Sequence, residues 1–361
     1  MAKTTTKKSK TGKKSESNKA NENSGQTVLV TGASGFIAKH CIIKLLNAGY
    51  QVRGSLRTPS RAEEVLAAIA PHADVERLSF VTLDLGSDEG WDKATRGCTY
   101  VMHVASPFPN TEPNHEDDLI IPARDGALRA LRAAAKSGVK RTVMTSSTAA
   151  VAAGHDDLAT RVINEDTWSN IDKTKSAYMK SKTIAERAAW DFINSEAANG
   201  MELAVINPGA VLGPLLDKDY STSGELVRKL ISGEAPACPN IGFSSIDVRD
   251  VAEAHLRAMT MPEAAGKRFI LISKFAWMID ISKALHAAGY KSPTRRLPDF
   301  LVRILAMFDK TIKLILPQLG EKTNIDNTRL RTVLGIEPRG IEEMSVAMAK
   351  TMIEYGVVKR R

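Results

Sequence analysis

The stretch Thr31-Gly32-Ala33-Ser34-Gly35-Phe36-Ile37-Ala38 directly follows the apolar run Val28-Leu29-Val30. This order predicts a strand, a glycine turn with G-x-x-G-x-x-A spacing, and the start of a helix. The backbone N–H groups of such a turn, and the positive end of the helix dipole, can lie against a pyrophosphate. We therefore expect a dinucleotide-binding site here. Its expected contact residues are Gly32, Ser34, Gly35, Phe36 and Ile37.

Strand-like and helix-like segments alternate from Gln26 to Pro208. Strands are expected at residues 27–31, 51–56, 78–83, 99–104, 141–145 and 203–207, and helices at 36–47, 61–70 and 117–137. Such alternation is typical of a parallel sheet with helices on both faces. The predicted fold class is α/β, a doubly wound Rossmann sheet followed by a smaller, mainly helical C-terminal lobe.

The second predicted strand ends in Val52-Arg53-Gly54-Ser55-Leu56-Arg57 and carries no acidic residue. Proteins that prefer NAD usually place a carboxylate there, which binds the ribose 2′-hydroxyl. Arg57 can instead form a bidentate pair with a 2′-phosphate, which a carboxylate would repel. The predicted cofactor is therefore NADP(H), the alternative being an Arg57 that is only solvated. Arg53, Ser55 and Arg61 are further candidates for the 2′-phosphate site.

Tyr178 and Lys182 are four residues apart in a predicted helix, so their side chains share a face. A tyrosine can protonate a carbonyl oxygen as hydride arrives, and a neighbouring ammonium lowers its pKa from about 10. Ser147 follows a predicted strand, and the carboxyl ends of such strands meet at the cofactor crevice. The predicted catalytic residues are Ser147, Tyr178 and Lys182, with Ser146 as the alternative serine.

The sequence resembles the extended short-chain dehydrogenase/reductase superfamily, and within it the dihydroflavonol reductase-like branch of NADPH-dependent aldehyde and ketone reductases. The resemblance spans roughly residues 27–358. The motifs that carry it are VTGASGFIA at 30–38, VRGSLR at 52–57, HVASPF at 103–108, TSS at 145–147, YMKSKTIAERAAWDF at 178–192 and NPGAVLGP at 207–214.

The resemblance assigns further cofactor contacts. It implies that Arg57 binds the 2′-phosphate and that Asp84 and Leu85 bind the adenine, although Asp84 could also cap a helix. It implies that Val104 and Ala105 line the path of the ribose and phosphates. The residues expected at the nicotinamide end are Pro208, Val211 and Ser223, together with Tyr178 and Lys182.

The chain departs from specialised relatives at the substrate side. Residues 148–152 lack the asparagine with which plant dihydroflavonol reductases bind the flavonoid ring, and residues 174–178 lack the N-W-Y-C-Y signature of cinnamoyl-CoA reductases. The Asp-Glu pair of superfamily dehydratases is replaced by Thr148-Ala149. We therefore expect reduction of an aldehyde or ketone with an apolar substituent. Phe108, Leu215, Leu216, Phe243 and Trp277 are candidates for the substrate pocket.

Other functions are considered for the same motifs. A hydroxysteroid-type dehydrogenase and an NAD-dependent nucleotide-sugar epimerase are the enzymatic alternatives, and Arg57 argues against the epimerase. The non-enzymatic alternative is a protein that senses NADP or associates with nucleic acid, which the basic amino terminus suggests. A sensor has no need of a proton donor such as Tyr178.

Three segments are expected along the chain. Residues 1–25 carry seven lysines against Glu16 and Glu22, about +5 of the total net charge of +9, and are expected to form a disordered basic tail. Residues 26–207 are the predicted NADP-binding Rossmann domain. Residues 208–361 are the predicted substrate-binding lobe, from which strands could return to the first domain.

Composition bears on partners and location. Cys41, Cys98 and Cys238 are widely spaced, which favours a reducing compartment. Residues 300–316 are apolar but interrupted by charges, so no membrane span is expected. His103 is predicted to be packed, and His155 with Asp156 and Asp157 to be a hydrated loop and not a metal site. We expect a cytoplasmic monomer or homodimer that binds a small carbonyl substrate and no metal, with nucleic-acid binding limited to the tail.

Overall fold

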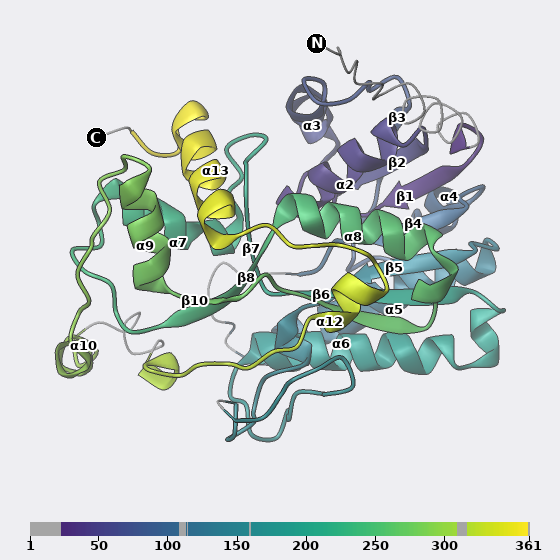
Figure 1. Ribbon diagram of the computed structural model, residues 1–361. Coiled ribbons are helices and arrows are strands. Elements are labelled where there is room, and N and C mark those ends of the chain that lie inside the picture. The colour runs from purple at the N-terminus through teal and green to yellow at the C-terminus, as the bar shows by residue number, and fades with distance from the viewer. Residues whose placement is uncertain (1–22, 108–112, 114, 159, 309–315, 360–361) are drawn as a thin grey trace, which may run out of the picture.

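The computed structural model describes residues 23–107, 113, 115–158, 160–308 and 316–359 (Figure 1). Nearly all of the predicted basic tail, and Phe108, therefore lie outside the described residues. Within the described ranges, no helix is both long enough and apolar enough to cross a membrane.

A seven-stranded parallel sheet forms the centre of the molecule, in the order β3-β2-β1-β4-β5-β6-β9. The inner strands are buried on both faces, as β1 and β5 are, because helices cover both sides. The predicted fold class is confirmed. The strands are β1 (Thr27–Val30), β2 (Gln51–Leu56), β3 (Leu78–Thr82), β4 (Tyr100–His103), β5 (Arg141–Thr145), β6 (Glu202–Pro208) and β9 (Lys267–Leu271).

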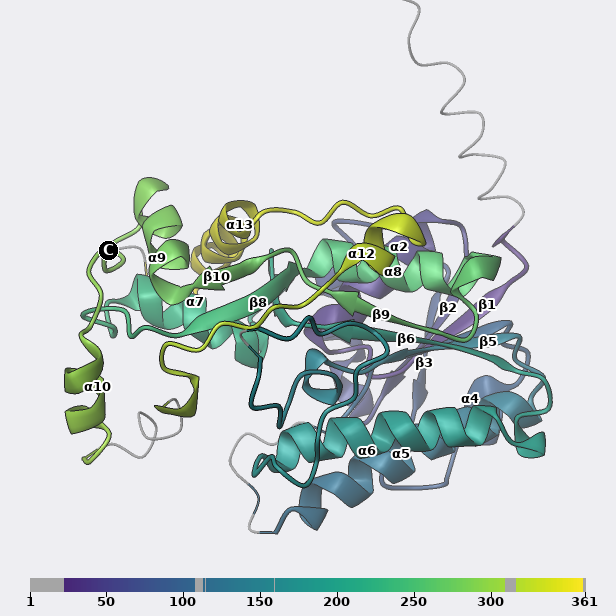
Figure 2. The ribbon, with the colours of Figure 1, turned by 60° about the horizontal axis from the view of Figure 1, so that its bottom comes forward.

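Two helical layers enclose the sheet (Figure 2). Helices α2 (Phe36–Asn47) and α8 (Val248–Thr260) pack against each other on one face, with α3 (Ala62–Ile69) beside α2. Helices α5 (Asp117–Lys136) and α6 (Ala177–Ile193) pair on the other face, with α4 (Trp91–Thr95) beside α5. Each layer buries its own apolar cluster against the sheet.

The part of the chain beyond β6 is less uniformly helical than expected. It contains a three-stranded sheet in the order β10-β8-β7, formed by Phe275–Trp277, Gly242–Asp247 and Ala210–Leu212. These strands are short and lie among Gly, Pro and Ser, so their periodicity is weak in the sequence. Besides α8, the described helices of this part are α7 (Ser221–Ser232), α9 (Met278–Ala287), α10 (Asp299–Leu305), α12 (Thr328–Thr332) and α13 (Ile341–Glu354).

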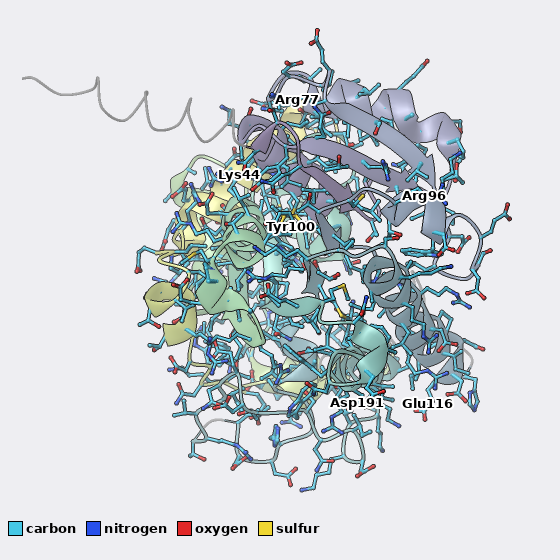
Figure 3. The ribbon with its side chains drawn as sticks, turned by 90° about the vertical axis from the view of Figure 1, so that its right-hand side faces the viewer. Lys44, Arg77, Arg96, Tyr100, Glu116 and Asp191 are labelled. Carbon is cyan, nitrogen blue, oxygen red and sulfur yellow. The ribbon has the colours of Figure 1, made fainter. Side chains whose placement is uncertain are left out.

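Short 3₁₀ turns complete the described chain: η1 (Pro59–Arg61), η2 (Thr148–Ala150), η3 (Glu196–Ala198), η4 (Pro262–Ala264) and η5 (Leu316–Gln318). A view from the side shows Glu116 and Asp191 at the periphery and Tyr100 near the centre (Figure 3), where its side chain is only 7% exposed.

The second part of the chain is not spatially separate from the first. Strand β9 pairs in parallel with β6 from Ala204↔Lys267 to Pro208↔Leu271, and α8 packs on α2. The sequence allows that strands of residues 208–361 could return to the first domain, and β9 does so. The boundary at residue 207 itself stays a prediction.

Candidate active site

The glycine turn after β1 lies between the ends of β2 and β4. Gly32 has φ +69°, and a Cβ atom built there would lie 3.0 Å from the Cβ of Ala105. Its N–H donates to the hydroxyl of Ser55 at 3.0 Å, and the Ala33 N–H donates to the Ser55 carbonyl at 2.8 Å. A Cβ on Gly54 would lie 2.8 Å from that of Ala33. Glycine is therefore required at 32 and 54 for this close approach.

Helix α2 begins directly after this turn. Gly35 is its N-cap, and no side chain provides a capping hydrogen bond. The first N–H groups of a helix have no partner within the helix. Phosphate oxygens are good acceptors for them. The turn, including Ser34, Phe36 and Ile37, therefore fits the pyrophosphate of a dinucleotide.

Arg57 follows β2 and is exposed. The structure gives it no hydrogen bond or ion pair within the described residues, whereas Arg61 is held by Glu64 at 2.7 Å. Arg53 turns to the carbonyl of Ala94 at 2.6 Å. Of the three arginines, Arg57 is therefore the best placed to bind an added phosphate.

The expected adenine and ribose contacts follow strands β3 and β4. The Asp84 carboxylate accepts the Gly86 N–H at 2.7 Å, so it orders a turn after β3 and does not cap a helix. Leu85 is half-buried next to it. Val104 and Ala105 follow β4, and the Ala105 N–H donates to the Thr31 hydroxyl at 3.0 Å.

Three predicted catalytic side chains come together at the carboxyl ends of the strands. Tyr178 lies in the first turn of α6, which Ser176 caps by accepting the Met179 N–H. The Tyr178 phenol is hydrogen-bonded to Ser147. The Lys182 ammonium lies 5.6 Å from the centre of the Tyr178 ring and donates to the Ser106 hydroxyl at 2.8 Å.

The two neighbouring serines point to different partners. Ser146 is buried, and its hydroxyl donates to the Glu186 carboxylate at 2.5 Å. Ser147 is half-buried, caps η2 by accepting the Ala149 N–H at 3.1 Å, and reaches Tyr178. Of the two serines, only Ser147 is placed beside Tyr178.

Burial controls the protonation of these groups. It raises the pKa of Tyr178, and the hydrogen bond to Ser147 opposes that rise. The lowered pKa expected from the sequence is not found in this structure, because burial is not visible in residue spacing. Burial also lowers the pKa of Lys182 to about 8, against the Glu186 carboxylate, which raises it.

A model of the NAD dependent epimerase/dehydratase family matches residues 28–272. The chain belongs to this family. It is 35% identical to cinnamoyl-CoA reductase CAD2 of Medicago truncatula over 285 residues, which cover 78% of this chain and 85% of that protein. It is 30% identical to tetraketide alpha-pyrone reductase 1 of Arabidopsis thaliana, over 91% of this chain and 96% of the relative.

Solved structures agree with this membership. The yeast methylglyoxal/isovaleraldehyde reductase Gre2, complexed with NADPH, is 29% identical with a TM-score of 0.76, covering 92% of this chain and 99% of that chain. The predicted branch of the superfamily and the predicted enzyme class, oxidoreductase, are confirmed by these relatives.

In this member of the family, the residues expected at the nicotinamide end lie on three elements. Pro208 ends β6, Val211 lies buried in β7, and Ser223 is half-buried in α7, which packs on β7. The role of Ser223 stays a prediction.

Two residues around the site were not assigned from the sequence: Ser106 accepts a hydrogen bond from Lys182, and Asn207 donates to the Ser147 carbonyl at 3.2 Å. Ser55 was a candidate for the 2′-phosphate site, and its hydroxyl instead accepts the Gly32 N–H of the glycine turn. The Ser106 and Asn207 positions stand in motifs of the resemblance, HVASPF and NPGAVLGP, which were the available signal. The sequence carried no signal for the direction in which these side chains point.

The remaining predictions have separate outcomes. His103 is packed as predicted, 3% exposed, with its ring nitrogen 3.1 Å from the Thr31 hydroxyl. Asp156 pairs with Lys173, and the described residues contain no group of three or more His, Cys, Asp or Glu side chains that could hold a metal. Leu215 and Leu216 are core residues, 2% and 5% exposed, whereas Phe243 and Trp277 are half-buried.

Proposed function

We propose that this protein reduces an aldehyde or ketone to an alcohol with NADPH. The observation that carries the proposal is the cluster of Ser147, Tyr178 and Lys182 beside the glycine turn. Ser147 is bonded to Tyr178, and Lys182 lies 5.6 Å from its ring. This combination supplies a proton donor and a carbonyl-binding hydroxyl next to a dinucleotide site.

The cofactor proposal rests on the fit of the residues present. The uncapped start of α2 offers N–H groups to a pyrophosphate, and the exposed Arg57 offers a guanidinium to a 2′-phosphate. The structural neighbour Gre2 is complexed with NADPH, which supports the same cofactor here. When bound, the reduced nicotinamide supplies the hydride.

The chain's own residues have distinct tasks in this mechanism. The Ser147 hydroxyl donates to the substrate carbonyl oxygen and holds it beside the phenol. Tyr178 gives its proton to that oxygen as the carbonyl carbon is reduced. Lys182 carries a positive charge near the phenol, which stabilises the phenolate left after proton transfer. Its contact with Ser106 shows that the ammonium can reach a hydroxyl in the segment after β4, and we propose that it also binds the nicotinamide ribose.

The substrate side is proposed more broadly. We propose an aldehyde or ketone with an apolar substituent, and Phe243 and Trp277 are the aromatic candidates that are not fully buried. Cytoplasmic location and a monomeric or homodimeric state stay predictions of the sequence. A panel of aliphatic, aromatic and steroid carbonyl compounds, assayed by loss of NADPH absorbance, tests the proposal. No turnover across the panel, with NADPH binding intact, would contradict the reductase function.

A further inference from the structure

A buried carboxylate lies behind the candidate active site. Glu186 is in α6, one helical turn after Lys182, and its side chain is fully buried. One oxygen accepts the Ser146 hydroxyl at 2.5 Å and the Asn207 amide at 2.7 Å. The other accepts the Arg268 guanidinium at 2.5 Å and the Trp190 indole at 3.4 Å. Glu186 thus joins α6 to the ends of β5 and β6 and to β9.

Two of these partners lie directly beside the candidate site. Ser146 precedes Ser147, and the Asn207 amide that reaches Glu186 also donates to the Ser147 carbonyl at 3.2 Å. The backbone of Ser147 is therefore held at two points, by the preceding residue and by its own carbonyl. Because Tyr178 and Glu186 belong to the same helix, this network sets the distance between the serine and the phenol.

Arg268 extends the network to the segment that connects Ser147 with Tyr178. Its guanidinium donates to the carbonyls of Glu165 and Thr167 at 2.9 and 2.8 Å and lies 3.8 Å from the ring centre of Trp168. A buried arginine with this pairing compensates the charge of the Glu186 carboxylate.

We propose that Glu186 is a positioning residue for the reduction, which holds Ser147 in register with Tyr178 through Ser146 and Asn207. This inference rests on the proposed roles of Ser147, Tyr178 and Lys182. Glu186 itself contacts neither substrate nor cofactor in this scheme, because its oxygens are occupied on the inner side of α6.

Lys182 is surrounded by a small set of titratable and charged groups, one of which is Glu186. Tyr178 and Glu186 face it from its own helix, His103 faces it from β4, and Arg268 lies beyond Glu186 on β9. Burial, and secondarily the charge of Lys182, lowers the pKa of His103 to about 4, so this histidine is neutral near pH 7. Glu186 is the group that raises the pKa of Lys182 against burial.

The test compares three full-length variants with the wild type. Glu186→Gln keeps the shape and removes the charge. Ser146→Ala removes one bond to the carboxylate and leaves its charge, and it is the variant to use if Glu186→Gln does not fold with Arg268 unpaired. Trp190→Phe is the matched control, because the hydrogen bond that it removes joins Glu186 to another residue of α6 and not to a strand. For each, kcat, KM, NADPH affinity by fluorescence and the pH profile of kcat are measured.

We expect Glu186→Gln to lower kcat roughly 10- to 100-fold and Ser146→Ala roughly 3- to 10-fold, with NADPH affinity nearly unchanged, because misplacement acts on the reacting geometry. In Glu186→Gln the alkaline limb of the profile moves to lower pH by about 0.5–1 unit, since Lys182 loses its proton earlier. Ser146→Ala keeps the wild-type limb, and Trp190→Phe keeps wild-type kcat.

A lowered melting temperature with wild-type kcat and pH profile in Glu186→Gln, or wild-type kcat in Ser146→Ala if the first variant is unfolded, would overturn the inference. This failure is distinct from failure of the proposed function. If Tyr178→Phe is inactive while the Glu186 and Ser146 variants behave as the wild type, only the positioning role is refuted. If Tyr178→Phe stays active, the proposed mechanism fails first.

Discussion

Two features of its surroundings act on the pKa of Tyr178 in opposite directions. Burial raises its pKa, while the Ser147 hydrogen bond favours the phenolate. We predict that Tyr178→Phe lowers kcat about 10²- to 10⁴-fold, the usual contribution of a positioned proton donor. NADPH affinity stays close to that of the wild type, because the ring and the Lys182 ammonium remain. Steady-state kinetics and a fluorescence titration with NADPH check both parts.

Arg57 provides the second prediction for a single residue. Arg57→Asp removes the guanidinium proposed for the 2′-phosphate and adds a charge that repels it. We expect the KM for NADPH to rise roughly 10²-fold, since losing a buried or bidentate charge pair costs about 2–5 kcal/mol, and NADH to become the better cofactor. Arg132→Asp, an exposed arginine of α5, is the control. Equal loss of activity with both cofactors would contradict the assignment.

Helix α2 is fastened to the loop after β7 by one ion pair. The Lys39 side chain is fully buried and pairs with Asp217, which is 17% exposed. We predict that Asp217→Asn lowers the free energy of unfolding by about 3–5 kcal/mol, because it leaves a buried ammonium without a counter-charge. Lys39→Met costs less, since the remaining carboxylate is partly solvated. Urea unfolding of both variants measures the difference, and equal losses would argue against this explanation.

Elements with strong periodicity were predictable from the sequence, and elements set by distant contacts were not. The bounds of α2 and of β2 and β5 agree with the prediction, because glycines and apolar runs lie next to each other in the chain. Strands β7 and β10, three residues each, depend on pairing with β8 and show no pattern of their own.

The candidate site shows the same division. The spacing of Tyr178 and Lys182 on one helix face was readable, as was the glycine turn. Which serine faces Tyr178 was not, because a one-residue step reverses the direction of a side chain after a strand. Glu186 and Ser106 were missed since their partners lie on other elements.

For the molecule as a whole, three buried histidines predict sensitivity to acid. Burial, the largest cause, lowers the pKa of His40, His103 and His255 to about 4 each, from 6.5. The unfolded chain therefore binds more protons between pH 6.5 and 4, and this stability, fully present above pH 6.5, is lost as pH falls through 4. The loss at pH 5 is on the order of 2 kcal/mol per histidine.

Comparison of a variant with the wild type isolates one of these contributions. Glu165 and Asp250, whose pKa values burial raises, act in the opposite direction in the same range. His255→Gln can keep a contact with the Thr145 hydroxyl, which lies 2.7 Å from the His255 ring nitrogen. We expect its unfolding free energy to fall less steeply than that of the wild type between pH 6.5 and 5. Parallel slopes in urea titrations would show that His255 takes up no proton on unfolding.

The pairing of β9 with β6 has a consequence for synthesis on the ribosome. When residue 207 has emerged, β6 still has an open edge, and its neighbour β9, Lys267–Leu271, has not yet been translated. Such an edge is a template for pairing with another chain. Some sixty further residues must therefore be added before β9 can pair with this edge, and a chaperone that binds during this interval would protect the nascent protein most.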